Sequence, residues 1–258
     1  MFEKEFIEIL EDPKSHQGFI QHQEKLITED GATVYPIIEG IPSFLKEGDV
    51  IGKNAKYQAF YDKVGCFTGS VFWFVCRLFR LDTVSKRKDL LSDLHVSDGD
   101  TVLETSIGAG ANIPSLTTEA CYVGVDISME MLRACQRYRL IKPYNLHLVH
   151  ANAEHLPFKD ETFDKVFHFG GINFFNDIPQ AILEMIRVAK PGAQIVIGDE
   201  TQDHVDSCYC KLPFVKKYFK DVEPVSPPIE LVPENMLNLK VQYKWNDSVY
   251  VISFNKPD

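Results

Sequence analysis

The sequence lacks long apolar runs, an excess of basic residues and any C-x-x-C pair. Its most apolar stretch, Val71–Cys76, is far shorter than the roughly 20 residues that cross a bilayer, so we expect no transmembrane segment. The 27 Lys and Arg residues face 37 Asp and Glu residues, and this net charge of −10 makes nucleic acid an unexpected partner. Acidic residues interrupt the apolar ones in Met1–Leu10, so we expect no secretory leader, and the six cysteines then indicate reduced thiols in the cytoplasm.

The chain divides into three stretches of different character. Residues 1–48 are interrupted by proline and glycine and are strongly acidic, which indicates a small separate module. Residues 49–97 carry apolar residues at helical spacing over Lys53–Cys66 and Val71–Arg80, which predicts a helical linker or lid. Residues 98–258 alternate short apolar runs with amphipathic stretches, which predicts the main α/β domain.

Short apolar runs in the main domain predict buried parallel strands. These runs are Thr101–Thr105, Tyr122–Asp126, Leu146–His150, Lys165–Phe169 and Gln194–Ile197. We expect amphipathic helices over Met129–Tyr138 and Ile178–Ala189. Near the end, Leu239–Trp245 and Ser248–Phe254 flank a two-residue turn, Asn246-Asp247, which predicts an antiparallel hairpin. The expected fold class is α/β, a doubly wound, Rossmann-like seven-stranded sheet that ends in this hairpin, with the small N-terminal module and the helical lid ahead of it.

A glycine-containing segment, Glu104–Gly110, follows the first of these strands. Gly108 and Gly110 allow the backbone to turn tightly and to approach a ligand, and a helix beginning there would offer N–H groups. The third glycine of a dinucleotide fingerprint is missing, and Glu104 at the strand end would repel a pyrophosphate. A carboxylate there suits a ligand that carries an amino group and a sulfonium, the alternative being a purely structural turn.

Asp126 ends the second strand, 22 residues after Glu104. An acidic side chain at this place can accept both hydroxyls of a ribose, much as in nucleotide-binding folds. The alternative role of such a residue is the N-cap of the following helix, for which Ser128 competes. Together with Glu104 and the two glycines, Asp126 favours a ligand that contains a nucleoside.

These segments resemble the motifs of class I S-adenosylmethionine-dependent methyltransferases. Glu104–Gly110 resembles motif I, E/D-x-G-x-G-x-G, with Ser106 in place of the first glycine. Val123–Ser128 resembles the ribose-binding segment, and Asn152–Phe158 resembles D-A-x-x-L-P-F, in which the acid and the next backbone N–H bind the adenine edge. Asn152 replaces that acid, and its amide oxygen can still accept from the adenine amino group.

Three further segments extend the resemblance. Phe163–Gly171 resembles the fourth motif, and Leu183–Gly192 resembles the helix that ends in V-A-K-P-G. Tyr61-Asp62 resembles a Tyr-Asp pair that the quinone-biosynthesis and small-molecule branch places beside the cofactor. The segment Gly170–Asn173 stands where DNA and protein amide methylases carry Asn-Pro-Pro-Tyr, which favours a small-molecule acceptor.

The resemblance implies S-adenosyl-L-methionine as the cofactor and methyl transfer to oxygen, carbon or nitrogen of a small-molecule acceptor. The implied cofactor-binding residues are Tyr61, Glu104, Ser106, Gly108, Gly110, Asp126, Ile127, Asn152, Ala153, His168 and Phe169. His168 is either a general base or a pocket residue that contributes its backbone carbonyl, so no catalytic residue is assigned. Two other functions stay open, an rRNA or tRNA methyltransferase and a non-catalytic cofactor-binding protein, and the acceptor and the oligomeric state are undefined at this point.

The N-terminal module resembles a zinc ribbon without its metal ligands. Tyr35–Leu45 resembles the close of modules found in activators of tRNA methyltransferases and at the start of some rRNA methyltransferases. The stretches that match their metal-binding turns, Leu10–His16 and Ile27–Gly31, contain no cysteine, and His16 and His22 do not supply four ligands. We therefore expect a metal-free, strand-rich remnant.

Three other features have a structural and a functional interpretation. Cys208-x-Cys210 is a candidate for soft-metal binding, although two ordinary helix residues are the more common case. Arg77, Arg80 and Lys86–Lys88 form a basic run that we expect to be a solvated helix face, with RNA or a lipid head group as the alternative. Tyr57 and Tyr61 lie four residues apart on one helical face, and we expect them to reach the cofactor pocket from the lid.

Overall fold

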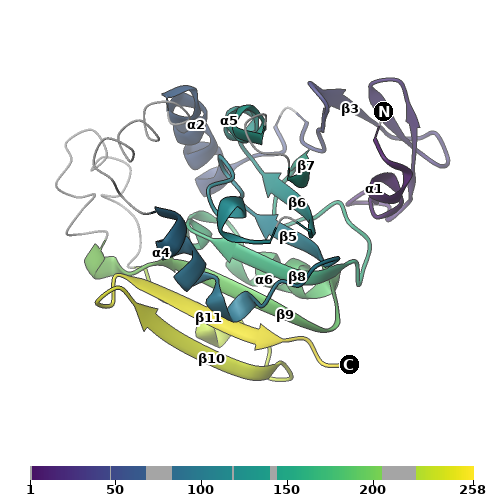
Figure 1. Cartoon of the computed structure of the whole chain (residues 1–258). Helices are drawn as coiled ribbons and strands as arrows, with labels where there is room; N and C mark the ends of the chain where they lie inside the picture. The colour runs from purple at the N-terminus through teal and green to yellow at the C-terminus, as the bar shows by residue number, and fades with distance from the viewer. Residues whose placement is uncertain (1, 47, 68–82, 118, 140–143, 205–224) are drawn as a thin grey trace.

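The computed structural model describes residues 2–46, 48–67, 83–117, 119–139, 144–204 and 225–258 (Figure 1). Its largest element is a seven-stranded mixed sheet with the order β10-β11-β9-β8-β5-β6-β7. The strands are β5 (Thr101–Thr105), β6 (Cys121–Asp126), β7 (Asn145–His150), β8 (Phe163–Phe169), β9 (Ala189–Glu200), β10 (Leu237–Lys244) and β11 (Val249–Asn255). The predicted doubly wound α/β fold is therefore confirmed, including the antiparallel hairpin of β10 and β11.

The five strands from β5 to β9 pair in parallel, and their order reverses at β5, which lies between β6 and β8. The residues of β5 and β6 are buried almost without interruption, because both faces of this part of the sheet are covered. Ligands of such sheets bind beyond the carboxyl ends of the strands, where the order reverses. The carboxyl ends of β5, β6 and β8 are therefore where a ligand is expected.

Helices cover both faces of this sheet (Figure 1). They are α1 (Lys4–Glu8), α2 (Gly52–Phe67), α4 (Thr83–Leu90), α5 (Met129–Arg139) and α6 (Ile178–Val188), with single turns η2 (Ser92–Leu94), η3 (Ile113–Ser115), η4 (Ile172–Phe174) and η5 (Ile229–Leu231). On one face, Leu90 of α4 and Leu132 of α5 share a buried cluster. On the other, Ile182 and Met185 of α6 belong to a second cluster. Among the described residues, no helix combines the length and the apolar character needed to span a membrane.

The N-terminal residues form a small antiparallel sheet beside the large one. Its strands are β1 (Phe19–His22), β2 (Lys25–Thr28), β3 (Val34–Ile38) and β4 (Ile41–Pro42), in that order. Ser43 forms a parallel bridge with His150 of β7, and the backbone N–H of Phe44 donates to the carbonyl of His150 at 2.9 Å. Phe6 and Leu10 lie in the same buried cluster as the core of the large sheet. The module thus covers the edge strand β7, whose N–H and C=O groups would otherwise be exposed.

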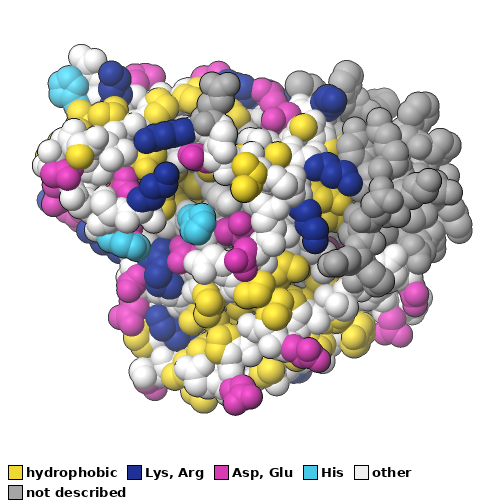
Figure 2. All heavy atoms as spheres, turned by 180° about the vertical axis from the view of Figure 1, so that it is seen from behind, with side chains coloured by type: hydrophobic (Ala, Val, Ile, Leu, Met, Phe, Trp, Pro, Cys, Tyr) yellow, Lys and Arg dark blue, Asp and Glu magenta, His cyan; other side chains and the backbone are white. Residues whose placement is uncertain are grey.

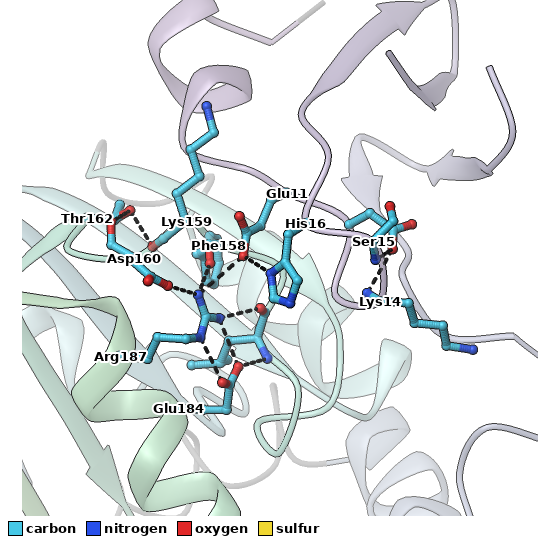
Figure 3. Close-up of polar contacts among 12 residues, drawn as sticks. Glu11, Lys14, Ser15, His16, Phe158, Lys159, Asp160, Thr162, Glu184 and Arg187 are labelled. Carbon is cyan, nitrogen blue, oxygen red and sulfur yellow. Dashed lines mark hydrogen bonds and ion pairs between the residues drawn. The ribbon is translucent and has the colours of Figure 1, made fainter. Parts of the chain in front are cut away.

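Arg187 of α6 joins this module to the main domain (Figure 3). Its guanidinium lies 3.3 Å from Glu11 and 2.8 Å from Asp160, and its Nε lies 2.8 Å from Glu184. It also donates to two backbone carbonyls of the segment between β7 and β8. Glu11 in turn pairs with His16 at 2.7 Å. The Arg187 side chain therefore links Glu11 of the N-terminal segment to Asp160 and Glu184 of the main domain.

Two local predictions are wrong. The hairpin loop comprises residues 245–248 instead of a two-residue turn, because Trp245, Asn246 and Asp247 all adopt left-handed backbone angles and Lys244 pairs with Val249. The segment after Gly110 forms the single turn η3 instead of an α-helix. Residues 111–120 are few for a helix and a connection to β6, and Pro114 has no N–H to donate.

Some predictions fall on segments outside the described residues. The helix expected over Val71–Arg80 and the pair Cys208 and Cys210 lie there, as do Arg77 and Arg80 of the basic run. Lys86 and Lys88 of α4 are exposed, in agreement with a solvated helix face, whereas Arg87 is half-buried and contacts Asn112.

Candidate functional site

A pocket of about 250 Å³ lies at the carboxyl ends of β5, β6 and β7. Its lining residues are Asn54, Ser106, Val125, Asp126, Ile127, Ala151, Asn152, Ala153 and Phe175. The structure thus brings five of the predicted residues together, Ser106, Asp126, Ile127, Asn152 and Ala153. Asn54 from α2 and Phe175 before α6 were not predicted, because neither belongs to a recognisable motif.

The loop after β5 bends sharply to form one wall of the pocket. Ser106, Gly108 and Gly110 have φ angles of 57°, 55° and 73°, which lie in the left-handed region. A Cβ on Gly110 would lie 2.5 Å from Sγ of Cys135 in α5, so glycine is required there. Ser106 adopts its angle at a cost of roughly 1–2 kcal/mol, and such strain is common at functional sites.

Glu104, the penultimate residue of β5, is only 1% exposed. Its Oε1 accepts a hydrogen bond from Nδ2 of Asn112 at 2.6 Å, while its Oε2 has no hydrogen-bond partner in the described part of the chain. Burial raises the pKa of Glu104 to about 8. A buried carboxylate oxygen without a partner is costly, and a cationic group of a ligand would relieve that cost.

Asp126, the last residue of β6, connects two loops of the pocket. Its Oδ2 accepts from the backbone N–H of Gly108 and its Oδ1 from that of Ser128, both at 2.8 Å. Each carboxylate oxygen keeps a second lone pair, which allows two further hydrogen bonds from a pair of hydroxyls. Burial raises the pKa of Asp126 to about 6, and the charge of Asp62 adds to this effect.

The competing role for Asp126, the cap of the following helix, belongs to Ser128. Oγ of Ser128 accepts from the backbone N–H of Met131 at 3.2 Å, as an N-cap residue of α5 does. The same Oγ donates to Asp62 of α2 at 2.5 Å. The carboxylate of Asp126 is therefore not needed for capping and faces the pocket.

Asn152 forms a turn within its own loop. Its Oδ1 accepts from the backbone N–H of Glu154 at 3.0 Å. The carboxylate of Glu154 accepts from Nδ2 of Asn54 and from the backbone N–H of Asn176, both at 2.8 Å. This loop therefore joins α2 and the segment before α6 at the pocket, and adenine binding by Asn152 and Ala153 stays a prediction.

His168 lies within the sheet and does not line the pocket. Its Nδ1 is 3.0 Å from Oγ1 of Thr105, and its Nε2 makes no hydrogen bond to any described residue. Burial lowers the pKa of His168 to about 4, so the ring is neutral near pH 7. This geometry argues against a general base, and a contribution of the His168 backbone carbonyl to the site stays a prediction. Phe169, which follows it, packs over Gly198 and is also absent from the lining.

Helix α2 covers the pocket with polar contacts along its length. Asn54 lines the pocket near its beginning, and Nε2 of Gln58 donates to the carbonyl of Ile127 at 2.8 Å. The ring of Tyr57 stacks on Phe174, with 3.9 Å between centroids. Burial raises the pKa of Tyr61, and the charges of Asp199 and Asp126 raise it further, so its hydroxyl lies within electrostatic reach of both.

A second polar group lies at the end of β9. Nδ2 of Asn173 donates to Asp199 at 3.0 Å and lies 3.3 Å from the hydroxyl of Tyr250. Burial raises the pKa of Asp199 and that of Tyr250. No sequence motif predicts this group, because its members come from η4, β9 and β11 and meet only in the folded protein. It lies two strands along from β5.

Known proteins are similar to this chain in sequence and in fold. A family model described as a methyltransferase domain matches residues 103–197. The demethylmenaquinone methyltransferase of Shouchella clausii is 33% identical over 147 residues, which cover 55% of this chain and 61% of the relative. That of Staphylococcus saprophyticus is 30% identical over 179 residues, which cover 67% of this chain and 70% of the relative. The first of these matches thus spans less than two thirds of the relative's length.

The fold also matches solved structures. A protein of Methanococcus maripaludis assigned as an S-adenosyl-L-methionine-dependent methyltransferase has a TM-score of 0.58 at 16% identity. The match covers 83% of this chain and 98% of that one. At this identity the likeness concerns the fold, which agrees with the sheet order found here.

Proposed function

The chain belongs to the class I S-adenosylmethionine-dependent methyltransferases of the quinone-biosynthesis type, and from this premise we propose that it methylates a small aromatic acceptor that carries a hydroxyl group. The family and the cofactor predicted from the motifs are thereby confirmed. The acceptor is inferred from the names of the relatives and from the groups that surround the pocket.

One observation carries the fit of the cofactor, the unpartnered Oε2 of Glu104 at the carboxyl end of β5. S-Adenosylmethionine carries an ammonium group, which would give this buried oxygen the cationic partner that it lacks. Asp126, at the end of the next strand, has lone pairs for the two ribose hydroxyls. The residues present therefore fit the group: Glu104 would hold its amino acid end and Asp126 its ribose.

When bound, the cofactor supplies a methyl group whose bond to sulfur breaks as the bond to the acceptor forms. The chain mainly aligns the two reactants and keeps water away from them. Helix α2 serves the second task, because Asn54, Gln58 and Asp62 fasten it across the pocket mouth. We infer on this basis that α2, within the stretch 49–97 predicted as a lid, covers the bound cofactor.

The acceptor is placed beside the polar group of β9. Asp199 lies on β9, two strand intervals or roughly 10 Å from β5, and Asn173 and Tyr250 are in hydrogen-bond contact with each other beside it. The rings of Tyr57 and Phe174 stack nearby, and Phe175 lines the pocket, which offers aromatic surface to a flat ring. The acceptor loses one proton as it gains the methyl group, and the buried Asp199, with its raised pKa, is suited to hold that proton.

Methyl transfer to 1,4-naphthohydroquinone tests the proposal. The protein is incubated with S-adenosylmethionine labelled in its methyl group and with the hydroquinone kept reduced, and the organic extract is counted. We expect labelled, methylated product from the wild-type protein and at least a hundredfold less from Asp199→Asn, whereas Asp203→Asn on the same chain serves as the matched control. Label transferred to RNA, or to none of a panel of phenols and hydroquinones, would contradict the proposed acceptor.

The two other functions have less support. Neither curated relative named above is an RNA methyltransferase. On the face seen in Figure 2, acidic side chains lie among the basic ones, which does not favour binding of a phosphate backbone. The set of pocket residues from Ser106 to Ala153 argues against a decayed, non-catalytic protein.

We also infer a cytoplasmic location, because Cys121 and Cys135 form no disulfide in the described part of the chain.

A further inference from the structure

Three polar residues from separate elements form a chain of hydrogen bonds behind the pocket. Nη1 of Arg87 in α4 donates to Oδ1 of Asn112 at 2.6 Å. Nδ2 of Asn112 donates to Oε1 of Glu104 at 2.6 Å. Arg87 lies outside the segment matched by the family model, residues 103–197, so the contact depends on how α4 packs in this chain.

The chemistry of the three groups allows one arrangement. A guanidinium only donates hydrogen bonds and an ionised carboxylate only accepts them. The amide of Asn112 must therefore turn its oxygen to Arg87 and its NH₂ to Glu104, and it is 5% exposed, so water does not readily take either place. Because Oε1 of Glu104 is occupied in this way, Oε2 is the oxygen left for a ligand.

We propose that Arg87 and Asn112 are positioning residues that hold the carboxylate of Glu104 in the orientation and charge state needed to bind the ammonium group of the methyl donor. The proposal rests on the proposed function and adds two residues and one specificity to it. The pair selects for donor molecules with an amino acid end over plain nucleosides, which need only Asp126 and the far side of the pocket.

The electrostatics act in the same direction. Burial favours the protonated form of Glu104, which does not attract a cation as a carboxylate does. The hydrogen bond from Asn112 and the charge of Arg87 lower the pKa of Glu104, while the charge of Asp126 from β6 raises it. Arg87 therefore opposes both the burial of Glu104 and the charge of its neighbouring acid.

Two ligands separate this role from a general structural one. S-Adenosylhomocysteine carries the amino acid end, whereas 5′-methylthioadenosine has the nucleoside and the thioether but no amino acid. We expect Arg87→Met to weaken the binding of S-adenosylhomocysteine about tenfold at pH 7. The variant should raise the pKa of Glu104, and at a pH below that pKa each unit of increase lowers the ionised fraction, and with it the affinity, about tenfold. The same variant should bind 5′-methylthioadenosine within about twofold of wild type. Arg87→Lys, which keeps the charge, should recover S-adenosylhomocysteine binding to within about threefold.

The pH profile gives a readout that lost packing does not move. Between pH 7 and 8.5, above the pKa of about 6 of Asp126, the wild-type affinity for S-adenosylhomocysteine should rise with pH as Glu104 ionises. Arg87→Met should shift this rise to higher pH, while 5′-methylthioadenosine should show no such slope. Asn112→Asp has the same size and places a second carboxylate beside Glu104, so it should weaken the binding of S-adenosylhomocysteine further. If Arg87→Met does not fold, this variant tests the relay, by which we mean the hydrogen bonds from Arg87 through Asn112 to Glu104.

Four results would overturn the proposal. Arg87→Met could weaken both ligands equally, which would show a structural role, or weaken neither. Glu104→Gln could keep the pH slope, which would show that another group titrates. Wild-type protein that bound neither ligand would overturn the proposed function, and the relay with it, whereas equal losses in the variant would remove the relay alone.

Discussion

Two buried carboxylates of this protein have opposite properties. Asp12 in the N-terminal module is 2% exposed, and Glu104 at the end of β5 is 1% exposed. Burial acts to raise the pKa of Asp12, but hydrogen bonds from the backbone of Ser15 and Lys14 and from Tyr35 leave it lowered. Glu104 has one hydrogen bond, and its pKa is raised to about 8. Both side chains are almost inaccessible to solvent, but Glu104 lies deeper in the protein than Asp12 and has fewer hydrogen bonds, so its carboxylate is the less stabilised of the two.

The same contrast holds between the N-terminal module and the carboxyl ends of the strands of the large sheet. In the module, turns that resemble metal-binding ones are closed by carboxylates, since Asp30 accepts from Thr28 at 2.7 Å and from Ala32 at 2.9 Å. Gln17 joins the two turns by donating to Asp30 at 2.9 Å. The described residues contain no group of three or more His, Cys, Asp or Glu placed to hold a metal. Hydrogen bonds within the chain satisfy the carboxylates of these turns, whereas Oε2 of Glu104 at the carboxyl end of β5 has no hydrogen-bond partner among the described residues.

The largest expected effect is on stability and concerns the module. Arg187→Met leaves Glu11 and Glu184 without their cation, and we expect a loss of about 2–4 kcal/mol in the free energy of unfolding. Urea denaturation measures it, with Lys190→Met as the matched control, because the pair of Lys190 with Asp164 is far more exposed and worth at most about 1 kcal/mol. The affinity for S-adenosylhomocysteine should stay unchanged. A parallel loss of affinity would mean that the two regions are not separate.

The next largest expected effect is on ligand affinity at the pocket and leaves the N-terminal module untouched. Asp126→Ala removes the proposed acceptor for the ribose hydroxyls. We expect it to weaken the binding of S-adenosylhomocysteine by about 1.5–3 kcal/mol, the range for hydrogen bonds to a charged group. Asp126→Asn, which keeps one oxygen, should lose less. Titration calorimetry gives both values. Unchanged affinity in Asp126→Ala would remove Asp126 from the site.

Opposite pKa shifts predict opposite pH dependences of stability. Asp12 has a lowered folded pKa, so its contribution is present above the unfolded pKa and is lost as the pH falls through the folded value. Glu104 has a raised folded pKa, so stability falls as the pH rises from about 4.5 towards 8, by about 1–3 kcal/mol after allowance for relaxation. In unfolding measured from pH 3 to 8.5, the acid limb should be shallower in Asp12→Asn and the decline above pH 4.5 should be shallower in Glu104→Gln, with other carboxylates supplying the remainder of each. If both variants followed the wild-type curve, the contrast between the two carboxylates would be refuted.

The smallest expected effect is on the hydrogen exchange of α2. On binding S-adenosylhomocysteine, amides of residues 53–66 should gain protection from hydrogen exchange, since α2 contacts the pocket through Asn54 and Gln58. Strands β1 to β3, which lie in the module, should not respond. If residues 108–113 gain protection while 53–66 do not, α2 is not the lid.

Much of the fold could be predicted because its strands are buried on both faces. Thr101–Thr105 was predicted to the residue, since a short apolar run between polar residues has few other interpretations. The predictions of a two-residue hairpin loop and of a helix after Gly110 failed, because three consecutive left-handed residues and a segment that forms only the single turn η3 depend on tertiary packing.

Some residues of the candidate site could likewise be predicted from the sequence, and others could not. Residues within a motif, such as Glu104 and Asp126, could be named because the chain itself sets their spacing along adjacent strands. Arg87 and Asn112 could not, since their contact joins two elements whose packing no local pattern encodes. Glu154 was overlooked for a similar reason, as its partners Asn54 and Asn176 are distant in sequence.

Glu104→Gln tests most directly whether the unpartnered oxygen of Glu104 is the mark of the donor site. The substitution keeps the size of the side chain and removes its charge. We predict that binding of S-adenosylhomocysteine weakens by roughly 30- to 100-fold at pH 7.5, while the melting temperature without ligand stays the same or rises, because an unsatisfied carboxylate has been removed. Unchanged affinity, or a loss of affinity accompanied by an equal loss of stability, would contradict the account.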